Sequence, residues 1–256
     1  MLVRNNIVGE SAISKTITVL GSTGSVGQNT LDLVERNPQK FSIRALTGNK
    51  NIKLLAKQAK VHGPELLVLG DKEYYRDLIE ELDGFPVRVE AGCEGLIEAA
   101  DLDTDLVMAS IVGTAGLLPT MRAAKRGATI ALANKECLVC AGTLLTSEVK
   151  NSGGVLIPVD SEHNAIFQVF DFDQTRAVKS LILTASGGPF REKTTKEMGK
   201  VKPREALAHP NWRMGPKITI DSATMMNKGL ELIEAFYLFP VNIDQIEILV
   251  HPQSIV

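Results

Sequence analysis

The stretch Val19-Leu-Gly21-Ser-Thr-Gly24-Ser-Val-Gly27 decides the fold that we predict for this chain. It follows a β-rich run, Thr16 to Leu20, and opens a segment with helical periodicity, Asn29 to Arg36. Glycines between a strand and a helix permit a tight turn and let backbone N–H groups approach a pyrophosphate at the helix N-terminus. A plain tight turn is the alternative. The candidate cofactor-binding residues are Gly21, Ser22, Thr23, Gly24, Ser25 and Val26.

Strand-like and helix-like runs alternate after this turn. Further strands are predicted at residues 41–46, 66–69, 86–89, 106–110 and 129–133, and helical stretches lie between them at 51–62, 72–82, 94–100 and 113–126, with another at 144–151. This alternation is typical of a parallel α/β sheet of the doubly wound, Rossmann type. We therefore expect a flexible tail over residues 1–15 and a nucleotide-binding domain over residues 16–154.

The pattern changes after Gly154. Strands are predicted at 155–159, 180–184 and 246–250, and a single helix at 222–239. Residues 186–216 are polar and contain several prolines and glycines, a composition that favours a mobile lid over a site. We expect an α+β catalytic domain over residues 155–256. Because the sequence stops at the start of another strand-like run, we expect this domain to be incomplete.

Composition excludes several classes of protein. The 256 residues carry a formal net charge of −2, so no basic field suggests a nucleic-acid partner. No apolar run approaches the ~20 residues of a membrane span, and the first fifteen residues do not resemble a secretion signal. Three cysteines fit a reducing compartment. The Cys137-x-x-Cys140 spacing is interpreted as coincidence, since a second cysteine pair is absent from the sequence.

The end of the second predicted strand indicates which dinucleotide is bound. An NAD site usually places an acidic residue there, about 20 residues after the glycines, to bind the ribose 2′-hydroxyl. This chain has a lysine with amide and hydroxyl groups instead, which suits a 2′-phosphate, so NADPH is favoured over NADH. A solvated loop lysine is the alternative. The candidate residues are Gly48, Asn49, Lys50 and Asn51.

Two carboxylates follow the strand at 155–159. In extended backbone, Asp160 and Glu162 point to the same face, and two close carboxylates repel unless a cation or a proton lies between them. Hard oxygen ligands favour Mg²⁺ or Mn²⁺ over zinc. The alternative is a solvated strand end.

A second polar cluster lies on the predicted helix at 222–239. Asn227, Lys228 and Glu231 share one face at i, i+4 and i, i+3 spacing, so Glu231 can supply a third metal oxygen. Ser222, Asn227 and Lys228 resemble a phosphate clamp; an intrahelical Lys–Glu pair is the alternative. Ser186, before Gly187-Gly188-Pro189, could hold an anion with freed backbone donors, or the segment is a simple Gly-Pro turn.

Seven motifs occur in an order that resembles the 1-deoxy-D-xylulose 5-phosphate reductoisomerase family, from about Lys15 to the last residue. They are Gly21-Ser-Thr-Gly-Ser-Val-Gly27, Ala133-Asn-Lys-Glu136, Val159-Asp-Ser-Glu-His-Asn164, Ser186-Gly-Gly-Pro-Phe190, His209-Pro-Asn-Trp-Arg-Met214, Asp221-Ser-Ala-Thr-Met-Met-Asn-Lys-Gly-Leu-Glu231 and His251-Pro-Gln-Ser254. The resemblance implies a Rossmann domain, a catalytic domain and a C-terminal helical domain, the last of which is missing from this sequence.

The resemblance also implies roles for individual residues. Metal would be held by Asp160, Glu162 and Glu231, and substrate by Ser161, Ser186, His209, Ser222, Asn227 and Lys228. Catalytic roles would fall to Lys135, Glu162, His209 and Glu231, and cofactor contacts would include Asn134, Glu136, Met214 and Gly215. Trp212 and Met214 would belong to a flap over the site.

The implied reaction is an isomerisation followed by a reduction. A divalent metal (Mg²⁺, Mn²⁺ or Co²⁺) would chelate the ketose oxygens of 1-deoxy-D-xylulose 5-phosphate, and NADPH would then deliver hydride to give 2-C-methyl-D-erythritol 4-phosphate. The implied partners are this small sugar phosphate and, at full length, a second copy in a homodimer. The implied location is the bacterial cytoplasm or a plastid.

Two departures from the family pattern leave alternatives open. Cys137 stands where the family usually has serine, and family members continue beyond the last residue of this sequence with strands that carry dimer contacts. One alternative is another NADP-dependent dehydrogenase, of the semialdehyde or homoserine type, the former using a nucleophilic cysteine with a histidine base. The other is a nucleotide-binding fragment without catalysis.

Overall fold

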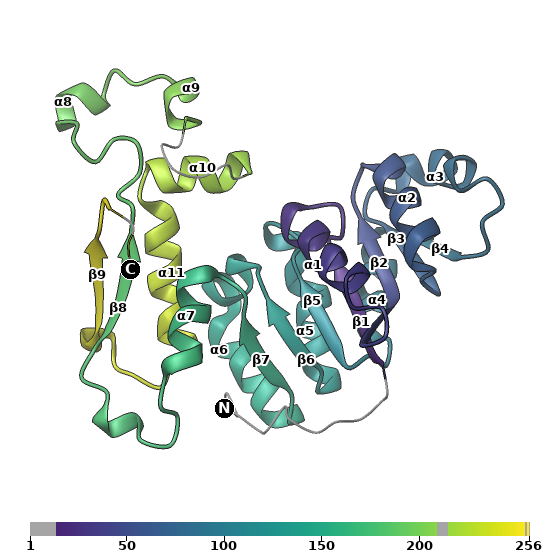
Figure 1. Ribbon diagram of the computed structural model, residues 1–256, viewed down its shortest axis with the longest axis horizontal. Helices are drawn as coiled ribbons and strands as arrows, with labels where there is room; N and C mark the ends of the chain where they lie inside the picture. Colours follow the sequence, from purple (N-terminus) through teal and green to yellow (C-terminus); the bar gives the residue numbers. More distant parts are fainter. Residues whose placement is uncertain (1–13, 209–214, 254, 256) are drawn as a thin grey trace. The chain divides into compact units, whose positions relative to one another are not determined.

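The computed structural model describes residues 14–208, 215–253 and 255 of the chain. The chain divides into two compact units between Asp160 and Ser161 (Figure 1). Among the described residues, no helix is both long enough and apolar enough to cross a lipid bilayer.

The described part of the first unit contains one sheet of seven parallel strands, in the order β4-β3-β2-β1-β5-β6-β7. The strand order reverses between β1 and β5, and in open α/β sheets ligands bind at such a switch point, outside the carboxyl ends of the strands. The strands are β1 (Lys15–Leu20), β2 (Phe41–Gly48), β3 (Leu66–Leu69), β4 (Arg88–Ala91), β5 (Leu106–Ala109), β6 (Thr129–Leu132) and β7 (Val155–Pro158).

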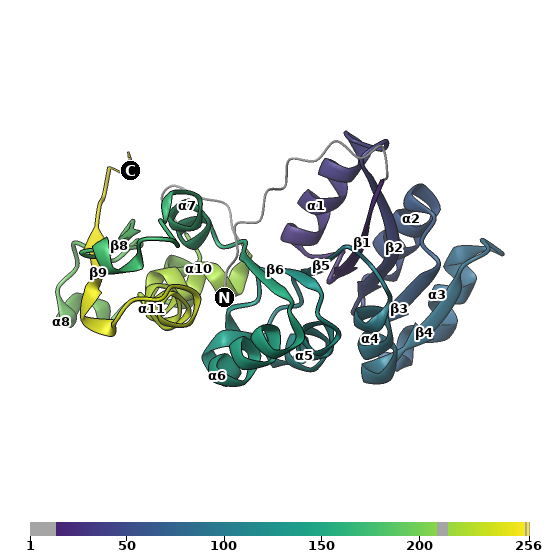
Figure 2. The same ribbon diagram turned by 90° about the horizontal axis from the view of Figure 1, so that it is seen from below.

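Helices cover both faces of this sheet. Apolar residues of α1, α2 and α3 share one buried core with β1, β2 and β3, whereas α4, α5 and α6 lie together on the opposite face (Figure 2). The connections also contain two short 3-10 turns. The helices are α1 (Ser25–Glu35), α2 (Ile52–His62), α3 (Tyr75–Leu82), α4 (Gly92–Asp101), α5 (Leu117–Arg126) and α6 (Lys135–Ser152), and the 3-10 turns are η1 (Lys72–Tyr74) and η2 (Thr114–Gly116).

The parallel sheet extends beyond the predicted boundary at Gly154. Strand β7 pairs with β6, with Leu132 opposite Pro158, because its four-residue apolar run continues the buried sheet. Helix α6 begins at Lys135, well before the predicted start at residue 144, since the Asn134 side chain accepts a hydrogen bond from the Cys137 backbone and caps the helix. The predicted Rossmann-type, parallel α/β architecture is confirmed.

The second unit holds a two-stranded parallel sheet, in which β8 and β9 are paired along five residues. Helix α11 packs against both strands, and α7 packs against β8. Short helices occupy the segment that was predicted to be a lid. The elements are α7 (Ser161–Val169), η3 (Thr175–Ala177), β8 (Leu181–Ala185), α8 (Thr195–Met198), α9 (Pro203–Ala206), α10 (Pro216–Ala223), α11 (Met226–Leu238), η4 (Ile243–Gln245) and β9 (Ile246–Val250).

Two predictions of local structure in this region are wrong. The backbone is not extended through Glu162, because helix α7 begins at Ser161 and places Glu162 in its first turn. The single helix predicted at 222–239 is two helices, since Met225 adopts a left-handed φ of 62° between α10 and α11. A left-handed non-glycine residue interrupts the helical hydrogen-bond pattern, so the chain changes direction at that point.

Candidate active site

The glycine-rich turn lies between β1 and α1, as predicted. Gly21 has a φ of +88°, which an L side chain rarely adopts, and a Cβ built on Gly27 would lie 2.3 Å from the Gly21 carbonyl oxygen. Helix α1 has the extended Gly24 at its N-cap, without a side-chain cap, so the helix N-terminus offers backbone N–H groups to an anion. The turn thus has the geometry of a pyrophosphate cradle.

Two residues that sequence reasoning did not select hold this turn in place. The Thr47 hydroxyl accepts from the Gly21 N–H at 2.8 Å, and its carbonyl accepts from the Ser22 N–H at 2.7 Å. The Ser22 hydroxyl donates to Gln58 Oε1 at 2.7 Å, while Gln58 Nε2 donates to the Ser22 carbonyl at 2.9 Å. Ser22 is fully buried, so its hydrogen bonds with Gln58 hold the turn from the protein interior. The sequence offered one sign of this role for Thr47, which is a polar residue at the end of an apolar strand and stands next to the candidate residue Gly48.

The residues after β2 lie beside the glycine turn. A Cβ on Gly48 would approach the Thr23 methyl group to 3.2 Å, so the two predicted cofactor segments do meet. The Asn51 side chain accepts from the Leu54 N–H and caps α2. The Lys50 ammonium lies 3.3 Å from an Asp71 carboxylate oxygen, and this hydrogen bond and charge raise the pKa of Lys50 above its ordinary value. Sequence reasoning missed this acid, which follows β3.

The segment after β6 places three predicted residues at the start of α6. Asn134 donates through Nδ2 to the Gly113 carbonyl at 2.8 Å, which ties the segment to the loop after β5. Lys135 is nearly buried and forms an ion pair with Asp160, two residues beyond β7. Glu136 lies half-buried in the first turn of α6. Lys135 and Asp160, predicted for catalysis and metal binding, are therefore direct neighbours.

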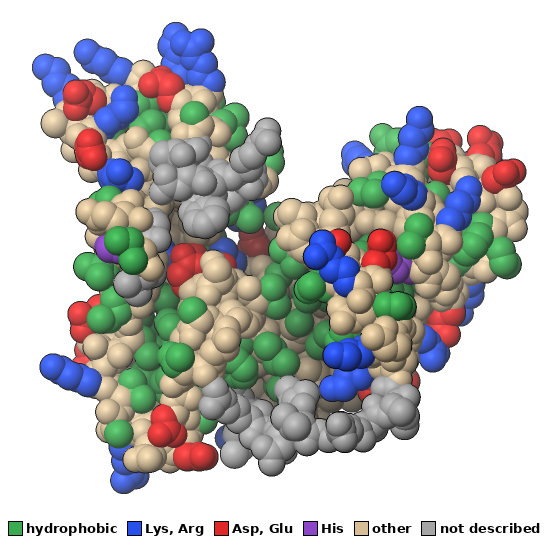
Figure 3. Space-filling view, viewed as in Figure 1, with side chains coloured by type: hydrophobic (Ala, Val, Ile, Leu, Met, Phe, Trp, Pro, Cys, Tyr) green, Lys and Arg blue, Asp and Glu red, His purple; other side chains and the backbone are tan. Residues whose placement is uncertain are grey.

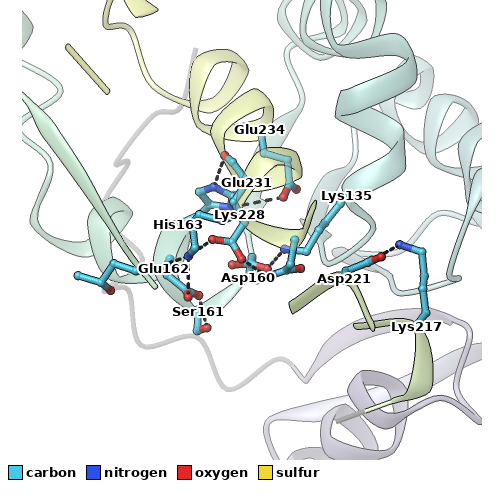
Figure 4. A network of polar contacts seen from close by, with 12 residues as sticks. Lys135, Asp160, Ser161, Glu162, His163, Lys217, Asp221, Lys228, Glu231 and Glu234 are labelled. Atoms are coloured by element: carbon cyan, nitrogen blue, oxygen red, sulfur yellow. Dashed lines mark hydrogen bonds and ion pairs between the residues drawn. The ribbon is translucent and has the colours of Figure 1, made fainter. Parts of the chain in front are cut away.

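A buried charged cluster lies on α11 of the second unit (Figure 4). The Lys228 ammonium donates to Glu231 and to the Thr184 carbonyl, and it lies 3.1 Å from Glu162 Oε1. The Lys228 side chain is only 5% exposed and that of Glu231 only 1%. Asn227 also donates to Glu231, as the i, i+4 spacing predicted. A cation already lies between two carboxylates, so this donor set suits a positively charged ligand.

Neighbouring residues fix this cluster. The fully buried His163 of α7 makes a 2.9 Å hydrogen bond with the backbone carbonyl of Glu231, which ties α7 to α11. Ser161 donates its hydroxyl proton to Glu162. Asp160 belongs to the first unit, and only Ser161 separates it from Glu162 in the chain. His163 was not selected from the sequence, although it lies within the quoted motif beside Glu162.

The predicted anion-binding loop follows β8. The Gly188 N–H donates to the Ser186 hydroxyl at 3.2 Å, and both Gly187 and Gly188 have positive φ values. A Cβ on Gly188 would lie 2.5 Å from the Ser222 carbonyl oxygen, so the loop lies directly against the end of α10. The structure therefore brings Ser186 close to Ser222, thirty-six residues away in the sequence.

The predicted lid is described only in part. His209, Trp212 and Met214 lie outside the described residues, whereas Gly215 precedes α10 and its carbonyl accepts from the Thr219 N–H and hydroxyl, both at 3.0 Å. Exposed basic side chains gather over α8 and α9 (Figure 3). The three cysteines are free thiols, and Cys137 is fully buried in α6.

Comparisons with known proteins identify the family. Residues 17–142 match the family model described as 1-deoxy-D-xylulose 5-phosphate reductoisomerase, and residues 156–239 match the model of its C-terminal domain. The chain belongs to this reductoisomerase family. The Sinorhizobium fredii reductoisomerase is 59% identical over 244 residues, and the match covers 94% of this chain and 62% of that protein. The chain therefore spans about three-fifths of the length of the curated relatives it matches.

Solved reductoisomerase structures resemble the structure of this chain closely. The Zymomonas mobilis enzyme in complex with NADPH superposes with a TM-score of 0.89 at 51% identity, covering 95% of this chain and 63% of that one. A complex with NADPH, fosmidomycin and magnesium gives a TM-score of 0.89 at 43% identity, covering 94% and 62%. The predicted family is confirmed, and the fold of the described residues is that of a reductoisomerase.

Proposed function

We propose that this chain carries the NADPH-binding and metal-binding parts of a 1-deoxy-D-xylulose 5-phosphate reductoisomerase. The reaction would convert 1-deoxy-D-xylulose 5-phosphate to 2-C-methyl-D-erythritol 4-phosphate. The observation that carries the proposal is the buried Lys228, held between Glu162 and Glu231 in a chain of this family. The substrate, the metal and the formation of a homodimer are proposals for the whole protein.

NADPH is the proposed cofactor, and the first unit supports it. The pyrophosphate would lie at the N-terminus of α1, which has no side-chain cap and so offers backbone N–H groups to an anion. The turn before this helix is tight, since its backbone leaves no room for a side chain at Gly27. The residues of this proposed cradle are Gly21, Ser22, Thr23, Gly24, Ser25 and Val26. Lys50, with Gly48, Asn49 and Asn51, would bind the 2′-phosphate as a charged donor. A solved relative carries NADPH, which agrees with this assignment. Asn134, Glu136, Met214 and Gly215 remain proposed contacts for the rest of the cofactor.

A divalent cation is proposed at Asp160, Glu162 and Glu231. Carboxylate oxygens are the donors that Mg²⁺ and Mn²⁺ prefer, and a related structure is a complex with magnesium. Glu162 and Glu231 already share the Lys228 ammonium, so their carboxylate oxygens are placed where they can contact a cation. A bound cation would supply Lewis-acid polarisation of the ketose oxygens, and bound NADPH would supply hydride.

The chain's own residues would bind and orient the substrate around these groups. Ser186, Ser222, Asn227 and Lys228 would bind its phosphate, which the closeness of the Ser186 loop to Ser222 supports. Lys135 would position Asp160, with which it forms an ion pair. Ser161 and His209 are proposed contacts for the rest of the sugar.

The test is oxidation of NADPH by the whole protein with 1-deoxy-D-xylulose 5-phosphate and Mg²⁺ or Mn²⁺. We expect turnover that requires the metal and disappears in the Asp160→Asn variant. NADPH binding without turnover would favour a nucleotide-binding protein without catalysis instead. A semialdehyde dehydrogenase, with Cys137 or Cys140 as its nucleophile, would lose turnover on cysteine alkylation while still binding metal. The fully buried Cys137 does not suit that role, whereas Cys140 is exposed, so alkylation tests Cys140.

A further inference from the structure

The loops after β2 and β3 are joined to each other by backbone hydrogen bonds. The Gly70 N–H donates to the Gly48 carbonyl at 2.7 Å, and the Asp71 N–H donates to the Asn49 carbonyl at 3.4 Å. These bonds place Asp71, which sequence reasoning did not select, beside the residues proposed to bind the ribose end of the dinucleotide. In an NAD site, an acidic residue in this region binds the 2′-hydroxyl, although it usually follows the second strand.

The Asp71 carboxylate is the fixed member of its ion pair with Lys50. One carboxylate oxygen caps η1 by accepting from the Glu73 N–H at 3.1 Å, and the other lies 3.3 Å from the Lys50 ammonium. The Asp71 side chain is 22% exposed, against 60% for Lys50. The Lys50 ammonium also lies 5.8 Å from the centre of the Tyr74 ring, a cation–π distance. Lys50 therefore moves more easily than the acid that holds it.

We propose that Asp71 is a second specificity-determining residue, which opposes the 2′-phosphate of NADPH that Lys50 attracts. A phosphate that approaches Lys50 must also approach a carboxylate fixed beside it, and like charges at this distance repel. NADH presents only a hydroxyl, to which the same carboxylate is an acceptable hydrogen-bond partner. Asp71 thus limits the preference for NADPH and keeps some affinity for NADH. This inference rests on the proposed function, since it requires a dinucleotide in the first unit.

The test is a comparison of dissociation constants for NADPH and NADH, measured by fluorescence titration of the chain and its variants without substrate. Asp71→Asn keeps an acceptor for the Glu73 N–H, so η1 retains its cap while the charge is removed. We expect NADPH to bind about three- to tenfold more tightly to this variant, since an exposed charge pair changes an equilibrium constant up to about fivefold and the phosphate is nearly doubly charged. NADH should bind equally or more weakly.

Salt and a matched variant separate charge from structure. The gain for NADPH should shrink at high ionic strength, because exposed charges are screened. Asp77→Asn removes an exposed acid from α3 and should leave both dissociation constants unchanged. Thermal unfolding without nucleotide checks that Asp71→Asn is folded.

The other outcomes are distinct. If Asp71→Asn weakens NADPH binding, Asp71 orients Lys50 for the phosphate and the proposal is wrong. An unchanged ratio of the two constants also overturns it. If the unmodified chain binds neither nucleotide, the proposed cofactor itself fails, and this inference fails with it.

Discussion

The two units build their candidate sites in opposite ways. In the first unit, the cradle consists of backbone, shaped by Gly21 and Gly27 and supported by uncharged hydrogen bonds from Thr47 and Gln58. In the second unit, the candidate site consists of charged side chains, with the buried Lys228 between the buried Glu231 and the partly exposed Glu162. A backbone cradle fails when an added atom does not fit, whereas a charged cluster fails when one partner is removed.

Removal of Lys228 should have the largest effect. Lys228→Met leaves Glu231 buried without its ammonium partner, so we expect the free energy of unfolding to fall by about 3–5 kcal/mol in urea titrations. Lys217→Met is the matched control, because its pair with Asp221 lies within one helix and the lysine is 45% exposed. That control should cost only about 0.3–0.5 kcal/mol. Equal losses would mean that the buried cluster has no special importance for stability.

Crowding of the glycine turn should come next. Gly27→Ala places a Cβ 2.3 Å from the Gly21 carbonyl, so the turn must shift, and we expect a loss of about 1–3 kcal/mol in stability. NADPH binding should weaken more than tenfold. Gly24→Ala is the control for stability, since its Cβ would lie 3.4 Å from the same oxygen, and it should change stability by less than about 0.5 kcal/mol. Similar stability of the two variants would show that the turn is not tightly packed.

The charge on Lys50 should affect affinity without affecting the fold. Lys50→Ala is expected to weaken NADPH about tenfold, the equivalent of one charge-assisted hydrogen bond, and NADH less than about twofold. Isothermal titration with both nucleotides measures the difference. Lys53→Ala, an exposed lysine of α2, serves as the control. Equal weakening of both nucleotides by Lys50→Ala would remove the 2′-phosphate from its proposed position.

The smallest effect should come from a histidine in the first unit. Burial lowers the pKa of His62 below its ordinary value, although the nearby Glu35 opposes this shift. The unfolded chain therefore binds a proton at a higher pH than the folded chain, so stability should decline as pH falls below the ordinary histidine pKa of about 6.5. His62→Gln should reduce this decline, measured as urea midpoints at two pH values. An unchanged pH dependence in the His62→Gln variant would contradict the assignment of this loss of stability to His62.

The sequence predicted those features that follow from local spacing. Glycine spacing after a strand predicted the turn between β1 and α1, alternating patterns predicted the parallel sheet, and i, i+4 spacing predicted the contact between Asn227 and Glu231. Features that depend on tertiary contacts were missed. Asp71 reaches Lys50 only because β3 pairs with β2, and His163 reaches Glu231 only because α7 packs beside α11.

The predicted secondary structure was wrong after β7, where the polar residues are compatible both with an extended strand end and with the start of a helix. Asp160 and Glu162 follow an apolar strand, so extended backbone was a reasonable expectation. An aspartate is also favoured at the position directly before a helix, and Asp160 holds that position because α7 begins at Ser161. The break at Met225 had no signal in the sequence, because methionine favours helices and rarely adopts a positive φ.

The most direct test of two separately built sites is a pair of titrations on the Glu231→Gln variant, with Mn²⁺ binding followed by electron paramagnetic resonance and NADPH binding followed by fluorescence. Glu231→Gln should weaken Mn²⁺ binding at least tenfold and leave the NADPH dissociation constant unchanged, because the cradle belongs to the other unit. Unchanged Mn²⁺ affinity, or an equal loss of both ligands, would contradict the assignment of Glu231 to the metal and not to the cofactor.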